Sequence, residues 1–210
     1  MRSTKLKRSL DILIALFALL LLLPLIALTA LLVRLKLGAP VIFRQRRPGL
    51  GGRPFIIYKF RTMLNLYDEN GRELPAEQRV TTFGRLLRRA SLDELPELVN
   101  VIKGEMSLVG PRPLRMRYLS RYTPEQYRRH EVKPGITGWA QVNGRNELTW
   151  EDRFKLDIWY VDNWNNWLDL KILWLTAISV LKREGVSARG SDSTVMSEFM
   201  GSADQCKSMN

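Results

Sequence analysis

The stretch Ile12–Val33, ILIALFALLLLLPLIALTALLV, is an uninterrupted run of 22 uncharged residues. At about 1.5 Å of rise per residue, a helix of this length could cross a hydrocarbon core about 30 Å thick. The run is too long for the apolar part of a cleaved signal peptide, and no small-residue cleavage site follows it. The fold is therefore expected to be organised around a segment that enters a membrane.

Two topologies are open for this segment. Pro24 lies near its middle and predicts a kink, because proline removes one helix hydrogen bond. Both flanks are basic, with Arg2, Lys5, Lys7 and Arg8 before the run and Arg34, Lys36, Arg44, Arg46 and Arg47 after it. Basic flanks favour the cytoplasmic side, and a plain spanning helix would carry one of them across. On the residues alone, a re-entrant hairpin and a span are evenly balanced, since proline also occurs in true spans.

The composition points to an anionic partner. The chain has 210 residues, of which 45% are hydrophobic, so it suits one modest domain or one domain with an appendage. A net charge of +12 indicates nucleic acid, a membrane surface or a phosphorylated substrate. The single cysteine, Cys206, excludes a disulfide framework and a zinc ribbon.

After the apolar run, the pattern predicts a β-hairpin. Val41–Gln45 and Phe55–Arg61 are typical of short strands, and the turn-rich stretch Pro48–Gly52 joins them. Alternation along the second strand puts Lys59 and Arg61 on its apolar face. These cations belong either to a site or to the solvated ends of a twisted edge strand, and the residues favour neither.

Short helices are expected at 83–89, 96–102, from Thr123 and from Thr149. Asp157 lies beside the apolar stripe of the last of these helices. It is either a buried carboxylate with a partner, and so a candidate site residue, or a stripe-edge residue that reaches solvent. Trp167–Leu181 is too short and too charged to span, and it is either a core helix or a helix on the membrane surface.

The densest group of charges is Arg88–Pro96, RRASLDELP. Ser91 and Glu94 have the spacing of a capping box, and the residues alone favour this structural interpretation because capping boxes are common. If the helix begins at Pro96, Asp93 and Glu94 lie just ahead of it, where the helix dipole stabilises negative charge. There, an aspartate could act as a nucleophile toward phosphorus and its neighbour could bind a divalent cation.

Rigid loops present further cations. Arg112 lies between Pro111 and Pro113, which fix the backbone on both sides and suit a bidentate phosphate contact; a solvated arginine in a rigid turn is the alternative. The loop from Lys133 to Arg145 offers donors for phosphate or sugar, but it matches neither a Walker loop nor a dinucleotide fingerprint. Together, the membrane segment, the paired carboxylates and the fixed cations indicate phosphoryl chemistry at a bilayer surface.

These stretches resemble the bacterial sugar transferases, which are monotopic polyprenyl-phosphate phosphoglycosyl transferases. The matching stretches, in the family's order, are Tyr58–Met63 (YKFRTM), Ser91–Pro96 (SLDELP), Gly104–Pro113 (GEMSLVGPRP) and Lys133–Gly138 (KPGITG) with Gln141–Arg145 (QVNGR). The chain is most similar in length to minimal members that begin glycan assembly, such as the bacillosamine-type transferases. One departure is Leu23-Pro24, where such members often have Ser-Pro.

The resemblance implies an enzyme that moves a sugar 1-phosphate from a UDP-sugar to polyprenyl (undecaprenyl) phosphate and releases UMP. It implies ping-pong chemistry with Asp93 as nucleophile and Mg²⁺ held at Asp93 and Glu94, with Glu94 as its ligand or orienting partner. It maps Lys59, Arg88, Arg112, Arg145 and Asp157 onto substrate- and phosphate-binding positions. An N-acetylated amino sugar is expected from the subgroup alone.

The expected fold is a helix-dominated α+β protein. Residues 1–38 form a re-entrant membrane helix, 39–186 form a cytoplasmic catalytic domain with a short β-hairpin and interfacial helices, and 187–210 form a tail. The expected location is the cytoplasmic face of the bacterial inner membrane. Membrane lipid is an expected partner, nucleic acid is not, and a homodimer is an open alternative.

Two competing functions predict different behaviour. In direct transfer through a ternary complex, Asp93 would only bind metal and the N-terminal helix would span the membrane. A non-catalytic module would use its positive charge to bind anionic lipid and would not need Asp93.

Overall fold

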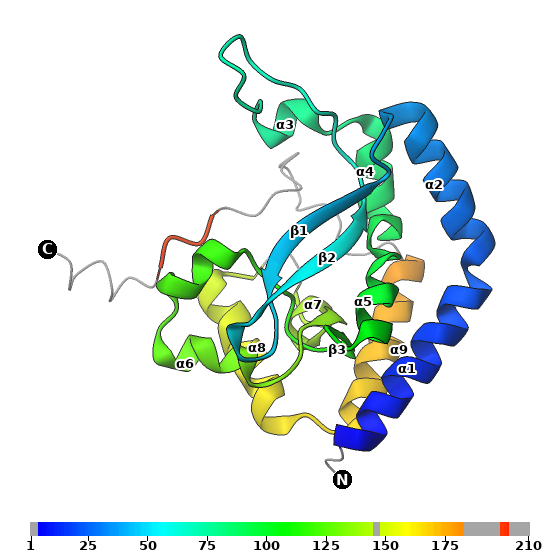
Figure 1. Ribbon diagram of the computed structural model, residues 1–210. Helices are drawn as coiled ribbons and strands as arrows, with labels where there is room; N and C mark the ends of the chain where they lie inside the picture. The colour runs from blue at the N-terminus through cyan, green and yellow to red at the C-terminus, as the bar shows by residue number, and fades with distance from the viewer. Residues whose placement is uncertain (1–3, 145–147, 183–197, 202–210) are drawn as a thin grey trace, which may run out of the picture.

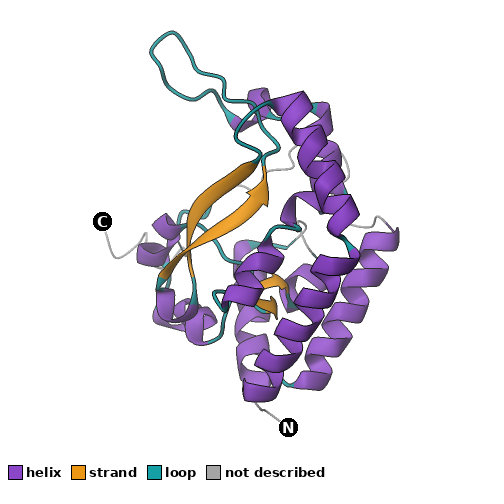
Figure 2. Cartoon of the chain, turned by 45° about the vertical axis from the view of Figure 1, so that its right-hand side comes forward, coloured by secondary structure: helices purple, strands orange, loops and turns teal. Residues whose placement is uncertain are grey.

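The computed structural model describes residues 4–144, 148–182 and 198–201. Within them, the chain is a helix-dominated α+β protein with a short antiparallel β-hairpin, as expected (Figures 1 and 2). The longer helices are α1 (Thr4–Leu21), α2 (Leu23–Leu37), α4 (Thr82–Arg89), α5 (Glu97–Lys103), α8 (Trp150–Asn163) and α9 (Asn166–Lys182). Single-turn helices are α3 (Ala76–Arg79), α6 (Pro124–Tyr127) and α7 (Trp139–Val142).

The apolar run forms two helices, α1 and α2, bent by 64° at Leu22. Pro24 lies in the first turn of α2, where its missing N–H breaks no helix hydrogen bond. The predicted kink is confirmed, but it falls at Leu22, just ahead of the proline, because Pro24 lies at the start of a second helix and does not interrupt a continuous one. Among the described residues, no single helix is long and apolar enough to cross a membrane, but this bent pair passes that test as a unit.

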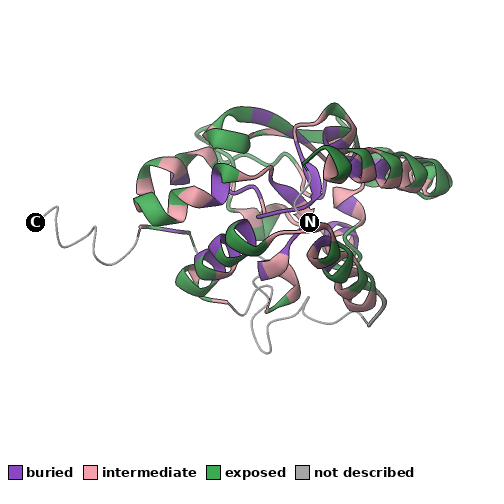
Figure 3. Cartoon of the chain, turned by 90° about the horizontal axis from the view of Figure 1, so that it is seen from below, coloured by how far each residue is buried: buried purple, intermediate pink, exposed green. Residues whose placement is uncertain are grey.

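The bent pair forms one side of the molecule (Figure 1), and much of its ribbon is exposed (green in Figure 3). Its exposed apolar side chains include Phe17, Leu20 and Leu31. Both of its ends contact the rest of the chain. Ala15 of α1 belongs to the main core with Val101 of α5. The far end of α2 packs in a separate cluster that contains Val33, Leu37, Phe60 and Leu87.

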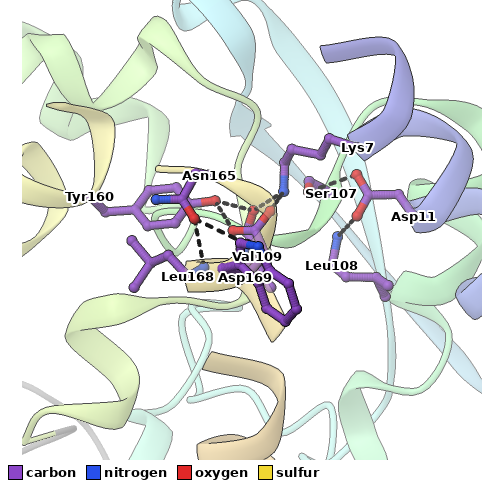
Figure 4. A network of polar contacts seen from close by, with 10 residues as sticks. Lys7, Asp11, Ser107, Leu108, Val109, Tyr160, Asn165, Leu168 and Asp169 are labelled. Atoms are coloured by element: carbon purple, nitrogen blue, oxygen red, sulfur yellow. Dashed lines mark hydrogen bonds and ion pairs between the residues drawn. The ribbon is translucent and has the colours of Figure 1, made fainter. Parts of the chain in front are cut away.

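Polar contacts tie the start of α1 to the globular part (Figure 4). Lys7 Nζ lies 2.6 Å from Asp169 Oδ2 on α9. The buried Asp11 carboxylate accepts hydrogen bonds from Ser107 Oγ at 2.8 Å and from the Leu108 amide at 3.2 Å. Because a buried carboxylate without partners is costly, these bonds fix how α1 lies against the domain.

The hairpin pairs β1 (Ile42–Pro48) with β2 (Pro54–Phe60), from Ile42 opposite Phe60 to Pro48 opposite Pro54. Both strands were predicted, but β1 continues through two arginines that gave no apolar signal. A second, parallel pair joins β3 (Ser107–Val109) to β4 (Gly135–Thr137). It was not predicted, since each strand has three residues and the partners are far apart in sequence.

Helix α9 combines features of its two proposed roles. Ile172 and Asp169 are buried against the core, as in an ordinary core helix. Trp167 and Trp174 are 78% and 68% exposed on its outer side, where tryptophan would suit the headgroup level of a membrane.

Candidate active site

Asp93 and Glu94 lie in a 3₁₀ turn, Leu92–Glu94, directly before α5. The capping-box interpretation of Ser91 and Glu94 is wrong. Ser91 adopts a left-handed conformation with φ 53° and its side chain caps no amide. This conformation is uncommon for residues other than glycine.

The Glu94 carboxylate is held by two cations. Its Oε1 lies 2.6 Å from Lys59 Nζ on β2 and 2.5 Å from Arg112 Nη2, which follows β3. Burial by itself would raise the pKa of Glu94, but the charges and hydrogen bonds of Arg112 and Lys59 outweigh it and hold the pKa well below its ordinary value. Glu94 is therefore ionised and already neutralised by its neighbours.

The Asp93 carboxylate has a different environment. The residue is 8% exposed, and among the described residues no hydrogen bond to its side chain is found. Burial, then the negative charge of Glu94, raises its pKa, while Lys59, Arg112 and Arg88 oppose that shift. Its oxygens therefore retain lone pairs for a substrate or a cation.

Arg88 approaches this pair from the last turn of α4. Its Nε donates a hydrogen bond to Thr62 Oγ1 at 3.0 Å. Burial lowers the pKa of Arg88 and the charge of Asp93 raises it. The bond through Nε thus fixes the side chain near Asp93. It leaves the rest of the guanidinium for another contact.

Glu97, in the first turn of α5, was not predicted as a site residue. It is 2% exposed, and its Oε1 lies 3.0 Å from Lys59 Nζ. Burial raises its pKa to about 7, against the opposing charge of Lys59. The available signal was its spacing, since Glu94 and Glu97 are three residues apart and share one helical face.

Asp157 is buried, so the alternative in which it reaches solvent is wrong. Its Oδ2 accepts hydrogen bonds from Arg129 Nη2 at 2.7 Å and Nε at 3.1 Å. The same Arg129 Nη2 donates to the backbone carbonyl of Arg112 at 2.9 Å. Asp157 thus holds Arg129, which holds the backbone of Arg112, and Arg112 contacts Glu94. Arg129 was not predicted as a site residue either.

The structure brings Lys59, Arg88, Asp93, Glu94 and Arg112 together and places Asp157 behind Arg112. Arg145 lies outside the described residues. Among the described residues there is no group of three or more Asp, Glu, His or Cys side chains suited to a metal. Mg²⁺ that is held by one or two protein carboxylates and substrate phosphate needs no closed protein cage. Asp93 and Glu94 would supply such ligands, since both cations beside Glu94 contact its Oε1.

Comparisons with known proteins identify the family of this chain. A model of the family described as bacterial sugar transferase matches residues 2–183. The uncharacterized sugar transferase EpsL of Bacillus subtilis (strain 168) is 56% identical over 199 residues, which cover 95% of this chain and 98% of EpsL.

Two further relatives carry named activities. A UDP-glucose:undecaprenyl-phosphate glucose-1-phosphate transferase of Xanthomonas campestris pv. campestris is 45% identical over 81% of this chain. A UDP-N-acetylgalactosamine-undecaprenyl-phosphate N-acetylgalactosaminephosphotransferase of Aeromonas hydrophila is 40% identical over 83% of this chain. The chain spans only 38% and 43% of these two proteins. The match to the family model covers most of the sequence, including both site carboxylates, and the chain therefore belongs to the bacterial sugar transferase family.

Proposed function

We propose that this transferase moves a sugar 1-phosphate from a UDP-sugar to undecaprenyl phosphate at the cytoplasmic face of the bacterial inner membrane. The products are UMP and a polyprenyl-diphosphate sugar. The printed activities of the relatives, which combine UDP-sugars with undecaprenyl phosphate, support this class of reaction. The observation that carries it is the difference between the two carboxylates: cations neutralise Glu94, whereas Asp93 beside it has no hydrogen bond among the described residues.

In the first step, an Asp93 oxygen attacks the β-phosphorus of the UDP-sugar. A carboxyl–phosphorus bond forms, the bond from that phosphorus to the bridging oxygen breaks, and UMP leaves with the electron pair. In the second step, a phosphate oxygen of the polyprenyl phosphate attacks the same phosphorus and releases the Asp93 carboxylate. Two displacements of this kind let a water-soluble donor and a lipid acceptor use one site in turn.

The neighbouring residues stabilise the charge that develops. Lys59 and Arg112 are fixed by Glu94, so they need little reorganisation when phosphate oxygens approach. Arg88, near Asp93, supplies a third cation for those oxygens. Asp93 and Glu94 would hold Mg²⁺, whose charge would neutralise the phosphate oxygens.

The re-entrant topology is part of this proposal. Arg8, at the start of α1, donates hydrogen bonds to the carbonyls of Val101 and Ile102 at 2.6 and 2.8 Å. At the end of α2, Arg61 donates to the carbonyl of Leu37 and, at 2.8 Å, to that of Ala39. Both ends of the bent pair are thus bonded to one domain, which supports a hairpin that enters and leaves the same leaflet.

The covalent step is tested with the purified enzyme and a UDP-sugar in the absence of lipid acceptor. We expect UMP equal to the amount of enzyme and a protein heavier by one phospho-sugar. Asp93→Asn should give neither product, whereas Glu94→Gln should retain a slow burst because its carboxylate does not bond to phosphorus. An active wild-type enzyme that gives neither signal would transfer directly in a ternary complex. If Asp93→Ala kept full function, the enzymatic proposal would fail and the non-catalytic lipid-binding module would be the remaining explanation.

The donor sugar is also proposed: a UDP-N-acetylated amino sugar. The relatives support a family that accepts different sugars, since their names specify glucose in one case and N-acetylgalactosamine in another. A panel of UDP-glucose, UDP-galactose and UDP-N-acetylated sugars, assayed by UMP release with undecaprenyl phosphate, tests it. Preference for a sugar without the acetamido group would contradict the amino-sugar donor and leave the reaction class intact.

A further inference from the structure

A short segment near the C-terminus, Glu198–Gly201, lies against the globular part (red in Figure 1). Phe199 is 3% exposed, although the segment has no regular secondary structure. Its ring lies among four aromatic rings, with centroid distances of 5.7, 5.8, 5.5 and 5.0 Å to Tyr118, Tyr122, Trp150 and Phe154. We call these four side chains the aromatic cage.

Polar contacts fix the segment on both sides of the ring. The Glu198 carboxylate pairs with Arg117 and Arg121 at 2.7 and 2.9 Å. The Phe199 amide donates to the Tyr118 hydroxyl at 3.3 Å, and its carbonyl accepts from Arg121. Backbone and side-chain contacts of this kind distinguish a specific docking site from a chance apolar contact.

The cage also supports Arg129. The Arg129 guanidinium lies 5.9 Å from the Tyr122 ring centroid and 5.7 Å from that of Phe154. It also donates to the Tyr122 hydroxyl at 3.4 Å. Rings at this distance attract a guanidinium and restrict where it can lie. Two of the four rings that hold Phe199 therefore also hold Arg129.

From Arg129, the contacts continue into the active site. Arg129 donates to the carbonyl of Arg112, and Arg112 pairs with Glu94. If the Phe199 ring is removed, Tyr122 and Phe154 face a void and must repack, because interiors are close-packed. A shift of these rings would move the surface that holds the Arg129 guanidinium. The Arg112 backbone, which Arg129 contacts, would move with it.

We propose that Phe199 is a positioning residue for the transfer reaction, because its docking in the aromatic cage sets Arg129 and thereby Arg112. The inference rests on the proposed function, but docking itself is measurable without it. Phe199 contacts no reacting atom. Its effect on the reaction passes through Tyr122, Phe154 and Arg129, which other parts of the chain also hold in place.

The test compares Phe199→Ala with Met200→Ala in the full chain. Met200 is the next residue but is 70% exposed, so its variant controls for changes to the segment as such. Hydrogen exchange of the amides at 118–122 and 153–157 reports docking independently of activity. We expect faster exchange there in Phe199→Ala alone, and a kcat lower by about tenfold with a smaller change in KM.

A double-mutant cycle separates positioning from general stability. If Phe199 acts through Arg129, adding Phe199→Ala to Arg129→Lys lowers kcat little further, whereas an independent structural role gives additive losses. If Arg129→Lys does not fold, Tyr122→Phe replaces it, since this change removes only the hydroxyl that accepts from Arg129. Unchanged exchange, unchanged kcat or additive losses would each overturn the proposal. A wild-type chain that releases no UMP from any donor would instead overturn the proposed function, and exchange would still report the docking.

Discussion

Glu94 and Glu97 both face the Lys59 ammonium group, yet their pKa values move in opposite directions. Arg112 also pairs with Glu94, so cations overcome the cost of its burial. Among the described residues, Glu97 has only Lys59 within ion-pair distance, and burial raises its pKa to about 7. One additional guanidinium thus decides which carboxylate keeps its charge at neutral pH.

Glu97 should make the folded state less stable as the pH rises. Its pKa in the folded state lies above the value of 4.5 for an exposed glutamate, so the folded state binds a proton more tightly than the unfolded state. Its stabilising contribution is complete below about pH 4.5 and is lost as the pH rises through about 7, with a difference of up to about 3 kcal/mol. Glu97→Gln should remove this dependence.

Denaturant unfolding of the detergent-purified chain at pH 5 and pH 8, with a chelator present, measures the effect. The expected result is a smaller loss of unfolding free energy between the two pH values in Glu97→Gln than in the wild type. Glu125→Gln is the matched control, because its carboxylate is largely exposed. Parallel pH dependence in the wild type and Glu97→Gln would contradict the raised pKa.

How far the sequence predicts the site depends on whether the signal is local. Asp93, Glu94 and Lys59 stand out because charges in a short motif or on an apolar strand face are visible in one stretch. Arg129 and Asp157 are 28 residues apart, so their buried pair follows only from the packing of α8 against the 3₁₀ helix Arg128–Glu131. The capping interpretation failed for the related reason that the sequence does not reveal the left-handed φ of Ser91.

Among the secondary-structure elements, the parallel pair β3–β4 has the largest consequence for the site. Arg112 follows β3 by three residues, so the strand pair fixes the backbone from which the Arg112 side chain extends. The two backbones approach so closely that a Cβ on Gly135 would lie 2.1 Å from the Gly110 amide nitrogen and 2.4 Å from the Thr137 carbonyl oxygen. Neither backbone atom can move without breaking the pair.

Gly135→Ala should therefore destabilise the fold by more than about 2 kcal/mol and abolish most UMP release. Ile136→Val, in the same strand, removes one methylene from a half-buried side chain and should cost less than about 1.5 kcal/mol. Thermal unfolding and initial rates of both variants test this. Equal stability of the two variants would show that β4 can shift away from β3.

The complete architecture makes a prediction about topology. In the structure, α1 begins and α2 ends against the same domain, through Arg8 and Arg61. Asp11 of α1, directly before the apolar run, is buried and accepts a hydrogen bond from Ser107 of β3. A spanning arrangement would separate these partners and expose a carboxylate to hydrocarbon or headgroups, which costs several kcal/mol.

Single cysteines test the side on which each end lies. In a Cys206→Ser background, Lys5→Cys reports the start of α1 and Asp68→Cys reports the globular domain, since both positions are exposed. A membrane-impermeant maleimide should label neither in intact spheroplasts and both after permeabilisation. Leu20→Cys, at the exposed apolar bend, should resist labelling in both conditions because the bilayer covers it. Labelling of Lys5→Cys but not of Asp68→Cys in intact spheroplasts would require α1 and α2 to straighten into a span, and would break the contacts that tie α1 to β3 and α5.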